Sequence, residues 1–183
     1  MVSAKRKVKA AEVPIRLDLG CGKNPREGFT GVDSRDFGQA HKVDLGKAKW
    51  PWADNSVEEA HSSHMIEHLT AAERIHFVNE LYRVLKPGGK CTVIVPHWAS
   101  CRAYGDLTHQ WPPVSEFWFY YLSKDWRATQ APHNDGYKCD FDAAWGYNQH
   151  PLLNGRNPEY VQHAWQFWKE AIQDIQAVLT AKK

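Results

Sequence analysis

Short apolar runs recur along the first half of the chain, separated by polar segments that carry glycine. Residues 15–19, 30–33 and 41–45 each have the length and apolar content of a short buried strand, and residues 60–65 predict a fourth strand from a weaker pattern. Residues 91–95 are rich in β-branched side chains and predict a fifth. The chain between these runs has room for helices or long turns.

A helical pattern precedes the fifth predicted strand. Thr70 and Glu73 have the spacing of a capping box, with Thr70 as the N-cap. Residues 87–89, Pro-Gly-Gly, end the helix. Strands that alternate with helices are typical of a parallel sheet, so the pattern predicts the α/β fold class. Between the two signals, apolar side chains recur at helical spacing at Ile75, Val78, Tyr82 and Leu85.

Aromatic side chains dominate the second half of the chain. Residues 97–126 contain nine of them, and we expect at least two-thirds to complete the core and the others to cover a ligand. Within this insert, residues 115–122 predict a short helix and residues 128–138 predict a loop. Residues 139–147 predict a strand.

The C-terminal part opens with a helix-start signal. Asn157 is the predicted N-cap, and Pro158 is the first helical residue. Residues 175–181 alternate apolar and polar side chains and are compatible with either a helix tail or a last strand. The predicted inner face of the helix consists of Tyr160, Ala164, Phe167, Trp168 and Ala171.

Composition indicates one globular domain. The chain has 183 residues, of which 43% are hydrophobic and 24% charged, which excludes intrinsic disorder. No apolar run approaches the roughly 18 residues of a membrane helix. The net charge of +2 is too small for a dedicated nucleic-acid binder. Four cysteines without a CxxC pair favour a reducing cytoplasm.

We expect a single domain over residues 13–183, with residues 97–135 as an aromatic-rich cap. Residues 1–12 form a basic segment without the apolar stretch of a secretory signal, and we expect a disordered tail there.

The most informative stretch is Leu-Asp-Leu-Gly-Cys-Gly at residues 17–22. A predicted strand ends at Asp18, and the two glycines after it let the backbone approach a ligand closely. Open α/β sheets bind ligands at the carboxyl ends of their strands. Asp33 ends the next predicted strand, where its carboxylate can accept hydrogen bonds from both hydroxyls of a ribose. Asp44 and Leu45 follow the third strand and are placed to meet the edge of a base.

These residues, in this order, resemble the class I S-adenosylmethionine-dependent methyltransferases over residues 13–96. The resemblance is carried by LDLGCG at 17–22 and by EHL…LYRVLKPGGK at 67–90, of which the second is similar to the small-molecule branch. Residues 95–111 are similar to a group of uncharacterised members. The resemblance implies a Rossmann-like, mostly parallel sheet with an antiparallel last strand, which would pair residues 139–147 with residues 175–181.

The resemblance also implies a function and a cofactor site. The function is methyl transfer from S-adenosylmethionine to a small-molecule or glycan-like acceptor, at oxygen or nitrogen. Asp33 would bind the ribose hydroxyls of the cofactor, and Ser63 and His64 would lie near its sulfonium. The implied cofactor-binding residues are Asp18, Gly20, Cys21, Gly22, Asp33, Asp44, Leu45, Ser63 and His64.

One departure from the family concerns the connection after the first strand. Only 7 residues separate Gly22 from Thr30, whereas a parallel crossover normally takes a dozen or more. The first crossover helix must therefore be shortened or missing. This argues against a dinucleotide cofactor, whose pyrophosphate binds at a helix N-terminus. It also keeps open a degenerate member of the family that serves as a binding or scaffold module without catalysis.

A hydroxyl acceptor would need a base in addition to alignment and desolvation. His109 is the first candidate and His97 the second, with Asp106 as a third catalytic residue. The histidines could instead only hydrogen-bond the backbone or fix the cap. Sequence spacing does not indicate a metal site made of these three residues, and we predict none.

Two nucleic-acid acceptors are disfavoured. Amino-methylating DNA enzymes resemble one another in an Asp/Asn-Pro-Pro-aromatic run after the fourth strand, where residues 62–65 here read Ser-Ser-His-Met. Cytosine C5 enzymes need a Pro-Cys nucleophile, and the chain has no Pro-Cys pair. A nucleic-acid-modifying enzyme that uses the basic tail remains an alternative.

Overall fold

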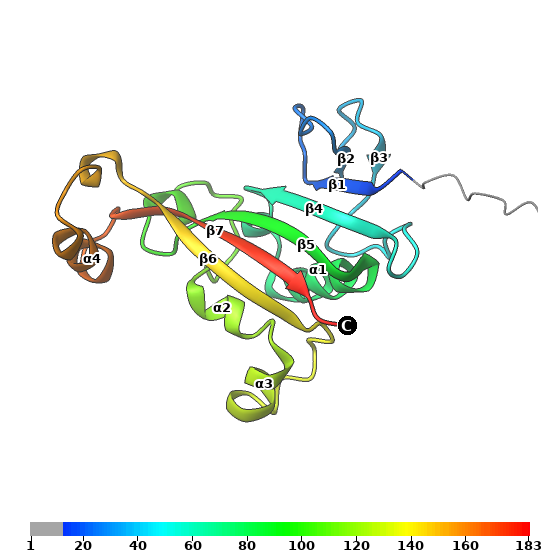
Figure 1. Ribbon diagram of the computed structural model, residues 1–183. Coiled ribbons are helices and arrows are strands. Elements are labelled where there is room, and N and C mark those ends of the chain that lie inside the picture. Colours follow the sequence, from blue (N-terminus) through cyan, green and yellow to red (C-terminus); the bar gives the residue numbers. More distant parts are fainter. Residues whose placement is uncertain (1–12) are drawn as a thin grey trace, which may run out of the picture.

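The protein is built on one seven-stranded sheet with the strand order β3-β2-β1-β4-β5-β7-β6 (Figure 1). The computed structural model describes residues 13–183, and the tail predicted over residues 1–12 lies outside them. Five strands run parallel, while β7 is antiparallel to both of its neighbours, β5 and β6. The strands are β1 (Ile15–Leu19), β2 (Thr30–Asp33), β3 (His41–Lys42), β4 (Val57–Ser63), β5 (Leu85–Pro96), β6 (Phe141–Gln149) and β7 (Ile172–Ala181).

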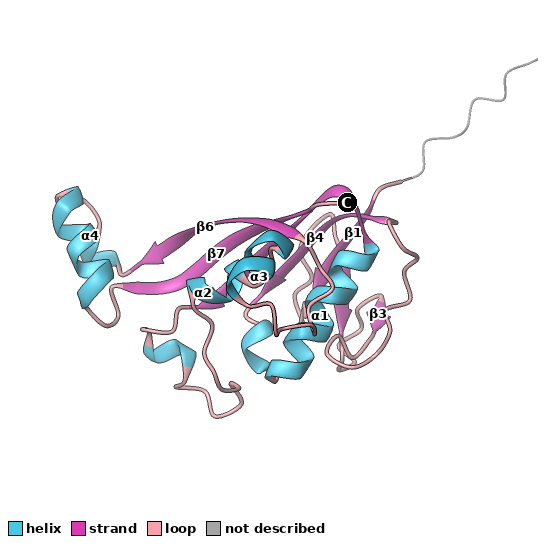
Figure 2. Ribbon diagram, turned by 90° about the horizontal axis from the view of Figure 1, so that it is seen from below, coloured by secondary structure: helices cyan, strands magenta, loops and turns pink. Residues whose placement is uncertain are grey.

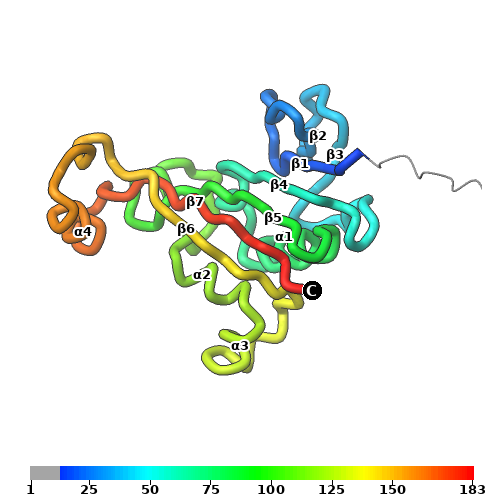
Figure 3. Tube along the Cα trace, in the orientation of Figure 1, coloured from blue at the N-terminus to red at the C-terminus, as the bar shows by residue number. Residues whose placement is uncertain are grey.

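The last strand along the chain is not the last strand of the sheet. β7, drawn in red, lies between β5 in green and β6 in yellow (Figure 3). The pairing starts at Lys90 opposite Thr180 and ends at Pro96 opposite Asp174. Residues 175–181 are therefore strand, and the predicted antiparallel last pair is confirmed.

Three of the four α-helices lie on the same face of the sheet (Figure 2). The helices are α1 (Ala71–Val84), α2 (Glu116–Tyr120), α3 (Lys124–Gln130) and α4 (Pro158–Phe167), of which α4 stands beyond the end of β6 and β7. None of the helices over residues 13–183 is long and apolar enough to cross a membrane.

The burial pattern of β7 reflects this one-sided covering. Ile175, Ala177 and Leu179 are fully buried under the helices, whereas Val178 and Thr180 point to the opposite face and stay half-buried. The sheet is thus covered by helices on one face, and its other face is open over β5, β7 and β6.

Helix α1 forms where the capping signal predicts it. The hydroxyl oxygen of Thr70 accepts the backbone N–H of Glu73, and the Glu73 carboxylate accepts the backbone N–H of Thr70. The buried face of the helix contains Phe77, Val78 and Leu81. The helix ends at Val84, and the predicted terminator, residues 87–89, lies within β5, where the register with β4 shifts.

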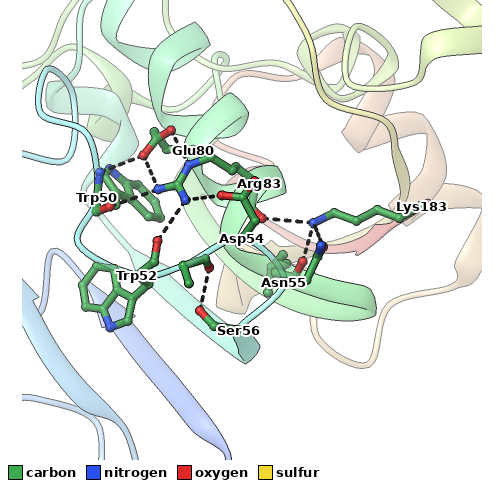
Figure 4. A network of polar contacts seen from close by, with 10 residues as sticks. Trp50, Trp52, Asp54, Asn55, Ser56, Glu80, Arg83 and Lys183 are labelled. Carbon is green, nitrogen blue, oxygen red and sulfur yellow. Dashed lines mark hydrogen bonds and ion pairs between the residues drawn. The ribbon is translucent and has the colours of Figure 1, made fainter.

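The end of α1 is tied to the connection between β3 and β4, which contains no helix (Figure 4). The guanidinium of Arg83 pairs with the carboxylates of Glu80 and Asp54 and donates to the backbone carbonyls of Trp50 and Trp52. Glu80 also accepts the backbone N–H of Trp50. This network fixes the buried Trp50 in the connection between β3 and β4.

The connection between β1 and β2 also has no helix, as the short spacing predicts. Residues 20–29 form successive turns instead. Phe29 packs edge-on against His61 of β4, and Arg26 donates its backbone N–H to Asp18 of β1. These turns therefore cover the sheet face that the α-helices leave open.

Several expected elements differ from those observed. The third strand is limited to His41–Lys42, and the fourth begins at Val57 rather than at residue 60. Residues 128–130 are the end of α3, so the predicted loop 128–138 is wrong at its start. The reason is a helix N-cap at Ser123, whose hydroxyl accepts the N–H of Trp126.

The predicted burial of the aromatic side chains is also wrong. Only Phe119 of the nine aromatics in residues 97–126 is fully buried, and Trp98, Tyr104, Trp111, Phe117 and Tyr120 are exposed. On α4 only Ala164 is buried, while Tyr160, Phe167 and the C-cap Trp168 are exposed; the fifth predicted inner-face residue, Ala171, is buried but lies beyond the helix. The reason is that α4 stands beyond the sheet and has little core to cover.

Candidate active site at the carboxyl edge of the sheet

The glycine turn after β1 is held by the neighbouring strand. The backbone N–H groups of Gly20 and Cys21 both donate to the carbonyl of Val32. The N–H of Gly22 donates to Asp33 Oδ2 at 3.0 Å, and Asp33 Oδ1 accepts the N–H of Arg35. Asp33 is buried. The carboxylate thus shapes the turn, and each of its oxygens keeps a second lone pair for a hydroxyl donor.

The two glycines of the turn have different roles. Gly20 has a φ of +79°, and a Cβ atom there would lie 2.2 Å from Met65 Cγ. Gly22 has a φ of +54°, and a Cβ there would meet nothing within 4 Å. Gly20 is therefore required by packing, whereas Gly22 borders open space beside Asp33. This open backbone next to a buried carboxylate fits the ribose and amino-acid groups of an adenosine-type cofactor.

Asp18 is engaged within the protein. Its Oδ1 lies 2.9 Å from His61 Nδ1, and its Oδ2 accepts the N–H of Arg26 at 2.8 Å. Cys21 is a free cysteine, and burial, together with the charges of Asp18 and Asp33, raises the pKa of its thiol. A neutral thiol in the turn is no nucleophile.

The other predicted cofactor residues are spread along the same edge. Asp44 is exposed and caps the N–H of Gly46, while Leu45 is buried in the hydrophobic core. Ser63 ends β4, and His64 follows it with a φ of +51°. His64 Nδ1 lies 3.3 Å from Glu67 Oε1. The Glu67 carboxylate raises the pKa of His64, and burial opposes the increase.

His97, at the end of β5, uses both ring nitrogens within the protein. Its Nδ1 accepts the N–H of Ala99, and its Nε2 lies 3.0 Å from Glu116 Oε1. His97 is buried and both of its ring nitrogens have protein partners, so neither nitrogen is open to a methyl-acceptor molecule. Although burial acts against it, the contact with His97 holds the pKa of Glu116 below its usual range.

His109 keeps one nitrogen free. Its Nδ1 lies 3.1 Å from the carbonyl oxygen of Ala103, which only accepts, so Nδ1 carries the proton and Nε2 has a free lone pair. The ring packs edge-on against His68, with centroids 4.7 Å apart. Asp106 is exposed and accepts both the backbone N–H and the hydroxyl of Thr108, which lower the pKa of its carboxyl.

The structure separates the three predicted catalytic residues. His109 and Asp106 share one turn and lie beside His68, whereas His97 pairs with Glu116 on α2. Among the described residues, the side chains that approach His109 as possible ligands are Glu67 and His68, and not His97 or Asp106.

Sequence reasoning quoted Glu67 within the 67–90 motif but gave it no role in the site, and it missed Arg74. Glu67 is buried, and so is Arg74, whose guanidinium donates to the backbone carbonyls of Ile66, Glu67, Gln110 and Pro112. Arg74 thus joins the segment after β4 to the segment around His109. A basic residue on the apolar face of α1 was the available signal, because buried arginines need several acceptors.

Comparison with known proteins agrees with this geometry. Residues 24–93 match the family of methyltransferase domains. No curated protein sequence matches the chain. A SAM-dependent methyltransferase from Archaeoglobus fulgidus is similar in structure, with a TM-score of 0.67 and 18% identity over 91% of this chain and 86% of that one.

Two further solved structures are similar at lower scores. Geranyl diphosphate C-methyltransferase from Streptomyces coelicolor A3(2) has a TM-score of 0.56 and 14% identity over 92% of this chain and 70% of that one. 1,6-Didemethyltoxoflavin-N1-methyltransferase from Burkholderia thailandensis has a TM-score of 0.52 and 11% identity over 93% and 72%. The chain thus matches a methyltransferase-domain family over residues 24–93, and its fold is similar to that of solved S-adenosylmethionine-dependent methyltransferases.

Proposed function

We propose that the protein transfers a methyl group from S-adenosylmethionine to a small-molecule acceptor, at oxygen or nitrogen. The observation that carries the proposal is the contact between Asp33 and the N–H of Gly22, which places a buried carboxylate beside open backbone at the carboxyl edge of the sheet. The methyltransferase match over residues 24–93 includes β2 and β4 of this edge. Both similar enzymes named with substrates, from Streptomyces and Burkholderia, act on small molecules.

The cofactor supplies an electrophilic methyl group on a sulfonium, so the chain has to orient two molecules and remove a proton. Asp33 would accept the ribose hydroxyls through its remaining lone pairs. His109 Nε2 would accept the proton of the acceptor, because Ala103 fixes the opposite nitrogen as the donor. We assign residues 97–135 as the acceptor cap, in which the exposed rings of Trp98 and Tyr104 would exclude water.

Cofactor binding is tested by the substitution Asp33→Asn, with Asp36→Asn as the matched control. Asp36 is exposed and only caps the N–H of Gly38. We expect S-adenosylmethionine at 100 times its dissociation constant to stabilise the wild type and Asp36→Asn by about 2.7 kcal/mol in a thermal melt. We expect Asp33→Asn to lose most of this shift. Absence of a shift with either S-adenosylmethionine or S-adenosylhomocysteine in the wild type would refute the proposal.

Transfer itself is tested with a radiolabelled methyl group and a small-molecule extract as the source of acceptors. We expect His109→Gln to lower the transfer rate by about 10²–10⁴-fold without changing cofactor affinity. The control His163→Gln changes an exposed histidine on α4 and should have no effect. Equal rates in His109→Gln and the wild type would exclude His109 as the base.

A second candidate function is a binding module that keeps the fold without catalysis. It is favoured by the missing helix after β1 and by Asp18, whose oxygens are occupied by His61 and Arg26. Fold alone does not establish activity. Such a module would be stabilised by both S-adenosylmethionine and S-adenosylhomocysteine in the thermal melt but would transfer no labelled methyl group to any extract.

A further inference from the structure

A buried carboxylate at the carboxyl edge has no hydrogen-bond partner. Glu67 lies in the short helical turn Ile66–His68 after β4, with only 4% of its surface exposed. Neither Oε1 nor Oε2 accepts a hydrogen bond, although His64 Nδ1 approaches Oε1 to 3.3 Å. The nearby charges of His64 and Arg74 offset part of the cost of burying this carboxylate, but both of its oxygens keep lone pairs for a further ligand.

Two histidines near this carboxylate each keep one ring nitrogen free of a protein partner. The Nε2 atom of His109 has a lone pair because Nδ1 donates to the Ala103 carbonyl. Thr108 gives its hydroxyl proton to Asp106, so it accepts from His68 Nδ1, which leaves His68 Nε2 free. One ligand atom from each of Glu67, His68 and His109 lies within 4.8 Å of the others.

The protein holds these three residues from both sides. The backbone N–H of Gln110 donates to the carbonyl of Glu67 at 2.8 Å. The buried guanidinium of Arg74 donates to carbonyls of both segments, at Glu67 and at Gln110. Each histidine also donates its Nδ1 proton to a protein acceptor, His109 to the Ala103 carbonyl and His68 to the Thr108 hydroxyl. Metal-binding histidines characteristically make such a contact, which fixes the orientation of the ring.

We propose that Glu67, His68 and His109 bind a divalent transition-metal ion, with Zn²⁺ as the reference ion, and leave one coordination position open. Two imidazoles and one carboxylate are the ligands of several catalytic zinc sites. Ligands at 2.0–2.1 Å from a tetrahedral ion are roughly 3.3 Å apart, so the side chains close by up to about 1.5 Å on binding. The exposed ring of His68 can make this movement.

This inference rests on the proposed function and narrows the chemical class of the methyl acceptor. Met65 packs against Gly20, two residues before Glu67, so the ion would lie next to the glycine turn. An open position on a divalent ion binds oxygen ligands and lowers the pKa of a bound hydroxyl. The favoured acceptors are therefore hydroxyl compounds that offer an oxygen to the ion. Because His109 Nε2 would be a ligand in the metal-bound protein, the base role assigned to it above applies to the metal-free protein, and the metal-bound protein would release the acceptor proton to water.

The test is a Zn²⁺ titration of tag-free, chelator-treated protein against a chromophoric chelator. We expect one ion per chain, with a dissociation constant of roughly 1 μM or lower. Glu67→Gln, His68→Gln and His109→Gln should each weaken binding by more than about 100-fold, and Thr108→Val by about 10-fold through the orientation of His68. His163→Gln should bind as the wild type does. Co²⁺ should give the intense visible bands of a four-coordinate site in the wild type and in His163→Gln, and should not give them in the three ligand variants.

Thr108→Val changes an exposed side chain, so its result does not depend on the tolerance of the buried site to substitution. Absence of stoichiometric binding in the wild type, or unchanged binding in the three ligand variants, would overturn the inference. The melt with S-adenosylmethionine on the same samples separates the two proposals. A cofactor shift without Zn²⁺ binding overturns only the metal site, whereas Zn²⁺ binding without a cofactor shift overturns only the methyl donor.

Discussion

At the scale of single residues, the glycine turn and the buried Arg74 show how the edge of the sheet is shaped. Gly20 and Gly22 share a left-handed backbone, but only Gly20 lies against another side chain, Met65. Sequence alone assigned both glycines to ligand approach. Their difference arises from Met65, which follows β4 and contacts the turn from a distant part of the chain.

Gly20→Ala should therefore be more destabilising than Gly22→Ala. Both variants strain a left-handed backbone, at a cost of about 1–2 kcal/mol, and Gly20→Ala adds overpacking against Met65 of roughly 1–3 kcal/mol. Urea denaturation of the two variants measures the difference. The double variant Gly20→Ala with Met65→Ala should recover part of it, and equal costs for the two glycines would contradict the packing role of Gly20.

Arg74 joins two segments that carry site residues, and its guanidinium has only backbone carbonyls as partners. We expect Arg74→Lys to lower the free energy of unfolding by about 2–4 kcal/mol, because a lysine cannot reach four carbonyls in one plane. Arg16→Lys, at an exposed ion pair with Glu59, is the control and should change stability by less than about 0.5 kcal/mol. Thermal melts compare the two variants.

At the scale of elements, the sequence predicted those features that depend on contacts between residues close together along the chain, such as the starts of helices. The capping box at Thr70 and the proline after Asn157 both start helices where expected. The burial of α4 and of the aromatic insert could not be predicted, because it depends on where those segments stand relative to the sheet. The pairing of His97 with Glu116 was missed for the same reason, because the two residues lie 19 positions apart on different elements. Arg74 is only seven residues from Glu67, and the signal on α1 was available.

Helix α1 makes the stability of the protein depend on pH through Glu73. The N–H and hydroxyl of Thr70 hold the pKa of Glu73 below its usual range. Its ionised form therefore stabilises the folded state above the unfolded pKa, and this contribution is lost as the pH falls through the folded value. Glu73→Gln should cost about 1 kcal/mol at neutral pH and progressively less below about pH 4.

Urea denaturation between about pH 3 and pH 7 measures this difference for Glu73→Gln. Glu58→Gln is the control, because Glu58 is exposed and pairs only with Lys86 at 3.6 Å. A cost of Glu73→Gln that does not change with pH would exclude the cap as its origin.

At the scale of the whole molecule, the helices of residues 13–183 cover one face of the sheet, and on the other face the described part of the chain places the turns of residues 20–29 (Figure 2). Neighbouring residues of β7 should therefore differ in their effect on stability. We expect Leu179→Ala to cost about 2–5 kcal/mol and Val178→Ala less than about 1.5 kcal/mol in urea denaturation. Similar costs at the two positions would show that the open face is covered in solution.

The position of β7 between β5 and β6 has a consequence for synthesis on the ribosome. Until residues 172–181 have emerged, β5 has an unpaired edge and β6 has no neighbour in the sheet. After β5, nearly half of the chain is therefore made before β5 and β6 can pair with β7, and the backbone donors and acceptors at the β5 edge stay exposed until then. Such non-local pairing slows folding and leaves strand edges open to aggregation. We therefore expect the β5 edge to stay unpaired in the nascent chain until residues 172–181 have left the ribosome.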